Sequence, residues 1–172
     1  MNLLSDDIES LYNYITNQQI LYVGIFGGSS TGKSAIFNNI LGEDILTIKD
    51  NECTRRGIII EDGEKIEIFK VNSSVVKSRE SNFFIFERTK KLASGKEKVK
   101  EILELLNEDY SENNNEYFIL TMPIRFFDEI ELDKDLRKYI KFIDIPGYNT
   151  EKSKKFPFNP LIESISCFLI KI

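Results

Sequence analysis

The sequence predicts an α/β fold of three layers, in which helices flank a mostly parallel central sheet. Two observations predict it. Residues 20–26 form a nearly continuous apolar run of strand length, and such runs suit strands that are covered on both faces. Apolar residues at helical spacing then follow over residues 34–41, after a glycine-containing turn. A buried strand followed directly by an amphipathic helix is the repeating unit of α/β proteins.

Residues 1–19 are expected to form a separate amphipathic helix before the main domain, which spans 20–172. Ser5 is a suitable N-cap, and two acidic residues follow it at the positive end of the helix dipole. Apolar residues then recur three, four and seven positions apart over residues 8–15.

Residues 57–71 predict a β-hairpin, because the dipeptide Asp-Gly at 62–63 separates two apolar runs. The polar residues 72–82 are expected to form a loop, and the apolar cluster 83–86 a buried strand.

A helix is expected over residues 95–107, where Ser94 and Glu97 form a capping-box pattern ahead of an apolar stripe. Apolar composition predicts the remaining elements: strands over 117–127 and 139–145, a short helix near 160–166, and a last strand over 167–172.

Composition excludes several classes of function. The chain of 172 residues carries 23 Lys and Arg against 28 Asp and Glu, a net charge of −5, which argues against nucleic acid as a partner. It has no histidine, so imidazole-based catalysis and imidazole metal sites are excluded. Its two cysteines, Cys53 and Cys167, form neither a disulfide framework nor a zinc motif. No signal peptide or membrane-spanning run is recognisable, which predicts the cytoplasm as the location.

Residues 27–34 satisfy the pattern G-x-x-x-x-G-K-S/T of a phosphate-binding loop. Its glycines allow the chain to wrap closely around a phosphate, with the N–H groups pointing inward. Lys33, expected in a solvent-filled site, supplies a positive charge for the β- and γ-phosphates, and the Ser34 hydroxyl can ligate Mg²⁺. The candidate nucleotide-binding residues of this loop are Gly27, Gly28, Ser29, Ser30, Thr31, Gly32, Lys33 and Ser34.

A second motif ends the strand predicted over 139–145, where Asp144 begins the sequence D-x-P-G. An aspartate at the C-terminal end of a strand beside the phosphate-loop strand occupies the position of the magnesium-side carboxylate. Gly147 has no side chain to prevent its N–H from approaching the γ-phosphate.

Thr54 lies between the phosphate-loop helix and the predicted hairpin. A threonine in a mobile segment there can offer its hydroxyl to Mg²⁺ and its N–H to the γ-phosphate. The candidate metal ligands are therefore Ser34, Thr54 and Asp144.

These motifs resemble the GTPase domain of the dynamin superfamily over about residues 20–172. The family has a similar Asn-x-Leu-x-Gly phrase after the phosphate loop, two arginines after the switch threonine, and a long insertion before D-x-P-G. The segments that carry the resemblance are 27–34, Asn38-Asn39-Ile40-Leu41-Gly42, Thr54-Arg55-Arg56 and Asp144-Ile145-Pro146-Gly147.

The resemblance implies binding of GTP and GDP, Mg²⁺-dependent GTP hydrolysis, homo-oligomers paired through GTPase domains, and membrane association through parts outside this chain. It implies catalytic roles for Ser30, Lys33, Thr54 and Gly147. Ser29 departs from the longer residue usual in the family. Tyr148 occupies the place of the water-orienting glutamine of Ras-like proteins, so hydrolysis would depend on backbone groups, Thr54 and a partner chain.

The guanine-reading pattern N/T-K-x-D is absent from the chain. The domain is therefore expected to be incomplete at its C-terminus, and two alternatives stay open. One is a catalytically impaired nucleotide-binding or interaction module, and the other is an ATP-using phosphate-loop ATPase. For the location of the protein, peripheral association with membranes stays open besides the cytoplasm.

Overall fold

A computed structural model describes residues 20–26, 32–47, 56–77, 82–108, 116–145 and 167–171. These residues form one seven-stranded sheet in the order β4-β3-β5-β2-β6-β1-β7. The strands are β1 (Leu21–Phe26), β2 (Gly57–Asp62), β3 (Glu67–Lys77), β4 (Asn82–Ser94), β5 (Tyr117–Met122), β6 (Ile140–Asp144) and β7 (Cys167–Lys171). The helices are α2 (Lys33–Leu41), α3 (Lys96–Glu108), α4 (Arg125–Glu129) and α5 (Lys134–Arg137). The predicted α/β class is confirmed.

The sheet is parallel around β1, which has β6 on one side and β7 on the other. β2 also pairs with β5 in parallel, whereas β2 runs antiparallel to β6. The longest strands, β3 and β4, pair with each other in antiparallel fashion, and β3 is antiparallel to β5. β1, the strand that leads into α2, therefore ends at the same edge of the sheet as its parallel neighbours β6 and β7.

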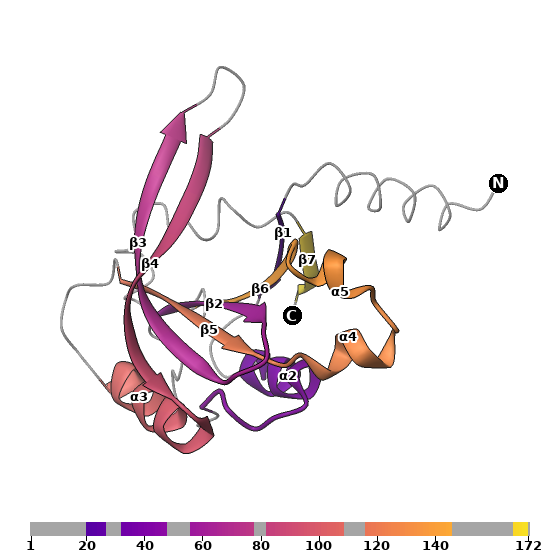
Figure 1. The fold of residues 1–172 in the computed structure, drawn as a ribbon, viewed down its shortest axis with the longest axis horizontal. Helices are drawn as coiled ribbons and strands as arrows, with labels where there is room; N and C mark the ends of the chain where they lie inside the picture. Colours follow the sequence, from indigo (N-terminus) through magenta and orange to yellow (C-terminus); the bar gives the residue numbers. More distant parts are fainter. Residues whose placement is uncertain are drawn as a thin grey trace.

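The main hydrophobic core lies between the sheet and three of its helices, which Figure 1 shows along the lower side of the molecule. Phe37 and Leu41 of α2, Leu103 of α3 and Phe127 of α4 are buried in it. The opposite face of the sheet carries a second buried cluster, made of Tyr22, Ile59, Val71, Tyr117, Ile119, Ile143 and Ile145. Alternate residues of a strand point to opposite faces, so strands buried on both faces explain the continuous apolar runs of the sequence.

The hairpin predicted over 57–71 is wrong, because β5 lies between β2 and β3 in the sheet. Thr121 of β5 is opposite Glu61 on one side and Glu67 on the other. Gly63 donates its N–H to the carbonyl of Met122 at 3.1 Å, so the Asp-Gly turn passes around the end of β5. The local turn signal is real, but a strand from much later in the chain separates its two arms.

β3 and β4 form the hairpin instead, in a register that runs from Glu67 opposite Ser94 to Lys77 opposite Asn82. The loop predicted over 72–82 is therefore also wrong for its first half, since β3 continues to Lys77. β5 accompanies β3 only over residues 67–71. Beyond that point the two strands continue as a pair that projects from the body of the molecule (Figure 1).

Several sequence-based elements are confirmed. α2 ends at Gly42, which adopts φ 78° and donates its N–H to the carbonyl of Asn38, as a C-cap glycine does. A Cβ atom at Gly42 would lie 2.6 Å from Cβ of Arg125, so close packing also requires glycine. α3 begins and ends one residue after the predicted helix.

The strand predicted over 117–127 is shorter than expected. β5 ends at Met122, since Pro123 has no N–H to continue the ladder, and α4 begins two residues later. The helices predicted within 1–19 and near 160–166 lie outside the described residues. Among the described helices, none is long and apolar enough to span a membrane.

Candidate functional site

The candidate site lies at the edge of the sheet where β1 and β6 both end. These strands are parallel neighbours, with Gly24 opposite Ile143, so their C-terminal ends meet at the same edge. The chain beyond β1 leads to α2, whose second residue is Ser34, and β6 ends at Asp144. The Ser34 hydroxyl donates a hydrogen bond to Oδ2 of Asp144 at 3.4 Å. This contact brings together Ser34 and Asp144, which are 110 residues apart in the sequence.

Gly32 is the N-cap residue of α2. It adopts φ 81°, in the left-handed region that favours glycine, and its carbonyl accepts the first helical hydrogen bond from the N–H of Ile36 at 3.0 Å. A Cβ atom at Gly32 would meet nothing within 4 Å, so backbone conformation and not space requires glycine here. The helix then begins with N–H groups that have no partner within the helix and are suited to bind an anion.

Lys33 is the first residue of α2, and only 7% of it is exposed. The sequence placed this lysine in a solvent-filled site, and the structure corrects that expectation. A long aliphatic stem can pack against apolar neighbours while its ammonium group reaches polar ones. Its position beside Ser34 puts the ammonium-bearing side chain at the same end of α2 as the Asp144 contact.

Asp144 is the most enclosed acidic group of the site, with 1% exposed. Its strand, β6, lies between β1 and β2, and Ile58 of β2 is directly opposite it. A carboxylate removed from water in this way requires hydrogen-bond donors or cations close by. The Ser34 hydroxyl is one such donor.

Arg56 is a residue of this region that the sequence analysis named only as part of the motif after Thr54 and did not predict as a site residue. Its side chain is 1% exposed and is among the largest fully buried side chains of the described residues. It precedes β2 by one residue, and so lies two positions from Ile58, the residue opposite Asp144. A guanidinium group is almost never fully buried unless it is paired. The only sequence signal for it was the pair of arginines after Thr54.

The described residues provide oxygen ligands for a small divalent cation. They contain no group of three or more His, Cys, Asp or Glu side chains that could hold a metal ion by itself. Ser34 and Asp144 do place a hydroxyl and a carboxylate oxygen 3.4 Å apart. Mg²⁺ prefers oxygen ligands, keeps several waters and uses one or two carboxylates, so this pair fits Mg²⁺.

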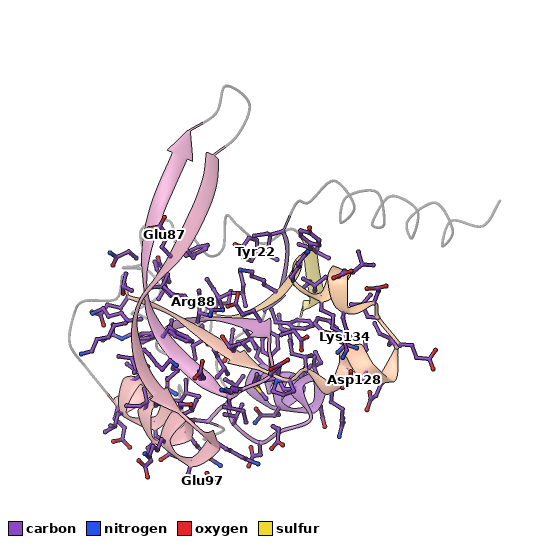
Figure 2. All side chains as sticks on the ribbon, viewed as in Figure 1. Tyr22, Glu87, Arg88, Glu97, Asp128 and Lys134 are labelled. Atoms are coloured by element: carbon purple, nitrogen blue, oxygen red, sulfur yellow. The ribbon has the colours of Figure 1, made fainter. Side chains whose placement is uncertain are left out.

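A charged cluster occupies the other end of β6 and is separate from the site. Glu61 of β2 forms ion pairs with Lys141 at 2.9 Å and with Arg88, which is labelled in Figure 2. Burial lowers the pKa of Lys141, and the charge of Arg88 lowers it further. Lys141 is opposite Glu61 in the β2–β6 ladder, so the cluster joins the strands of the sheet.

Other predicted site residues lie outside the described part of the chain. They are Gly27, Gly28, Ser29, Ser30, Thr31, Thr54 and Gly147.

Comparison with known proteins identifies the family. The model of the dynamin family matches residues 23–168, which include both the Lys33–Ser34 end of α2 and Asp144. The chain belongs to the dynamin family. The predicted resemblance is confirmed, and the described strands and helices are part of a dynamin-type GTPase domain.

Two solved structures that resemble this dynamin-family domain share one description, an oligomerised bacterial dynamin pair with a mechanism for long-range sensing and tethering of membranes. The first is 18% identical, with a TM-score of 0.42, over 88% of this chain and 19% of that chain. The second is 17% identical, with a TM-score of 0.42, over 91% of this chain and 22% of that chain. The chain therefore spans about a fifth of the length of these relatives. None of the curated proteins matches it significantly.

Proposed function

We propose that this dynamin-family domain binds GTP and GDP together with Mg²⁺ and hydrolyses the β–γ phosphoanhydride bond of GTP. The observation that carries the proposal is the contact between Ser34 and Asp144 at the start of α2. It joins the end of the phosphate-loop motif to the D-x-P-G motif, which is the arrangement that a magnesium–triphosphate site requires.

The phosphate groups are bound by the start of α2 and the loop before it. We propose that backbone N–H groups of the loop 27–32 and of the first turn of α2 would donate hydrogen bonds to the phosphates, and that Lys33 would contribute its positive charge. Because Lys33 is buried, its charge acts in a medium of low dielectric constant, where attraction to a phosphate is stronger than in water.

Ser34, through its hydroxyl, and Asp144 would hold Mg²⁺, and Thr54 would join them when triphosphate is present. The ion would neutralise negative charge on the β- and γ-phosphates. The hydrogen bond between Ser34 and Asp144 keeps these two oxygen ligands close to each other.

Hydrolysis requires a water molecule to attack the γ-phosphorus while the bridging oxygen leaves with GDP. Ser30, Thr54 and the N–H of Gly147 are the proposed groups that orient the phosphate and the water. The side chain of Tyr148 lacks the amide group with which a glutamine orients the attacking water. We therefore propose that pairing with a second GTPase domain supplies a group that contacts this water. In the full protein, we propose that GTP turnover is coupled to membrane remodelling. That full protein is proposed to be cytoplasmic and to associate peripherally with membranes.

A competition experiment tests the choice of nucleotide. The chain is equilibrated with a fluorescent guanine nucleotide and titrated with GTP or with ATP, in the presence of Mg²⁺. GTP is expected to displace the probe at lower concentration than ATP. Displacement by ATP at lower concentration would instead support an ATP-using enzyme, and failure of the probe to bind would support an interaction module that holds no nucleotide.

The substitution Thr54→Ala is expected to reduce GTP turnover by about tenfold or more, a loss of ~1.4 kcal/mol of transition-state stabilisation. Affinity for GDP is expected to change by less than about twofold, because the threonine contacts only the triphosphate state. Steady-state phosphate release and GDP titration measure the two effects. Thr89→Ala, on an exposed part of β4, is the matched control. Unchanged turnover in Thr54→Ala would remove Thr54 from the site.

A further inference from the structure

The two longest strands of the sheet extend beyond its body. β5 accompanies β3 only as far as Val71, and after this residue β3 pairs with β4 alone. This two-stranded part, residues 72–77 and 82–87, is the arm, and Figure 1 shows it projecting from the body of the molecule. Both register shifts of the β3–β4 pair lie before Asn72, on the side of the body. The arm itself is therefore a regular antiparallel ribbon without a bulge.

Both long edges of the arm are open within the described part of the chain. β4 is the first strand in the order of the sheet, so no described strand lies beside its outer edge. The other edge belongs to β3, which pairs with β5 only up to Val71. An open edge carries backbone N–H and C=O groups that are able to pair with another strand. A ribbon of two strands is only marginally stable in water, whereas three or more strands support one another.

The arm lacks the features that usually protect an open edge. Proteins prevent edge-to-edge pairing with charged residues, especially lysine, with proline and with bulges. Residues 72–76 and 82–86 contain no charged residue, no proline and no glycine. The charged residues of the arm are Lys77 at its far end and Glu87 at its base, where Figure 2 labels Glu87. Segments that are uncharged and rich in apolar, β-forming residues are the ones that pair with other strands.

The base of the arm is fixed to the body of the domain. The ring of Phe86 makes edge-to-face contacts with Tyr22 and Tyr117, with ring centroids 6.1 Å and 5.9 Å away. Two residues further along β4, Arg88 forms an ion pair with Glu61, and its guanidinium carbon lies 4.7 Å from the centre of the Phe69 ring. These contacts determine where β4 leaves the body, and so they hold its outer edge in position for a partner.

The chemistry of the arm selects the kind of partner. Lipid is excluded as the main one, because open strand edges do not occur in the hydrocarbon region of a membrane. The partner must therefore supply a strand. A second copy of this chain supplies the same edge, and two identical strands that pair in antiparallel fashion are related by a two-fold axis and are self-complementary. The chain has a net charge of −5, so two copies repel each other, and the uncharged part of the arm allows them to meet without opposing like charges.

We propose that the arm is a self-association surface, at which the outer edge of β4 pairs in antiparallel fashion with the same edge of a second copy of this chain. A register centred on Phe84 sets residues 82–86 of one copy opposite residues 86–82 of the other, so that only uncharged residues meet. The two arms then form one ribbon of four strands, which satisfies the requirement for three or more. This association needs no nucleotide and goes beyond the proposed GTPase function.

Sedimentation of the chain of 172 residues without nucleotide, over a range of concentrations, tests the proposal. The wild-type chain is expected to form dimers. Phe84→Lys combined with Ile85→Lys is expected to weaken the dimer by about tenfold or more, because like charges then lie across the pair and apolar cross-strand contacts are lost. Phe126→Lys combined with Ile130→Lys is the matched control, since it adds the same charges at exposed apolar residues of the α4 region. The control is expected to dimerise as the wild-type chain does.

Opposite charges at the same positions provide a second measurement. Phe84→Glu combined with Ile85→Glu is expected to dimerise as poorly as the lysine variant. An equal mixture of the two variants is expected to form a heterodimer with an affinity within about tenfold of wild type, because opposite charges across an antiparallel pair attract each other. Circular dichroism establishes that each variant is folded. If the double lysine variant does not fold, Ile85→Lys is compared with Ile130→Lys, and a loss of about threefold is expected.

A wild-type chain that stays monomeric without nucleotide up to about 100 μM would overturn the inference. It would also be overturned by a folded lysine variant that dimerises as the wild-type chain does, or by lysine and glutamate variants that do not associate with each other. Wild-type monomers that sediment with phosphatidylcholine vesicles, when the lysine variant does not, would identify lipid as the partner and overturn it as well. None of these results depends on GTP binding, so a failure of this inference and a failure of the proposed function are distinguishable.

Discussion

Replacement of Lys33 by alanine is expected to weaken binding of GTP by about 100-fold or more, since charge-assisted hydrogen bonds contribute ~1.5–3 kcal/mol each. Lys33 is the first residue of α2, lies beside the Ser34–Asp144 contact and is only 7% exposed. No other lysine or arginine of the described α2 can replace its charge, because the remaining residues of this helix are uncharged. Titration with a fluorescent guanine nucleotide measures the loss.

The matched control for Lys33→Ala is Lys134→Ala, which removes an exposed lysine at the start of α5. The control is expected to bind nucleotide as the wild-type chain does. Thermal unfolding of both variants separates loss of binding from loss of fold. Wild-type affinity in folded Lys33→Ala would show that Lys33 does not contact the phosphates.

Replacement of Phe127 by alanine is expected to lower the free energy of unfolding by about 3–5 kcal/mol, the range for buried phenylalanines. Phe127 is 1% exposed and stacks on Phe142 with ring centroids 5.7 Å apart. The guanidinium carbon of Arg137 lies 5.9 Å from the centre of its ring. Domains of this size have a total stability of about 5–15 kcal/mol, so this single change removes a large part of it.

Urea unfolding followed by circular dichroism measures the loss in Phe127→Ala. Phe126→Ala is the matched control, since the neighbouring phenylalanine is 40% exposed and is expected to cost less than about 1 kcal/mol. Similar losses in both variants would mean that α4 is not packed on β6 as described.

The elements that sequence could predict depend on local patterns. A continuous apolar run identified β1, and the glycine at position 42 identified the end of α2. The motifs around Lys33 and Asp144 identified the family, because a phosphate loop needs particular residues at particular spacing.

The features that sequence could not predict depend on contacts between distant residues. β5 pairs with both β2 and β3, and no pattern within 57–71 reveals that a third strand enters between them. Asn38 and Arg56 belong to recognisable motifs, but their burial arises only when the sheet and helices have assembled. Their burial could therefore be recognised only from the structure.

The insertion of β5 between β2 and β3 has a consequence for how this domain forms during synthesis. β2 leaves the ribosome with neither of its sheet neighbours, since β5 and β6 are both encoded much later in the chain. β3 and β4 can pair as soon as they emerge, because they are consecutive and joined by a short connection. The apolar strands β1 and β2 must wait for the second half of the chain, and in that interval they are open to association with other nascent proteins or to capture by chaperones.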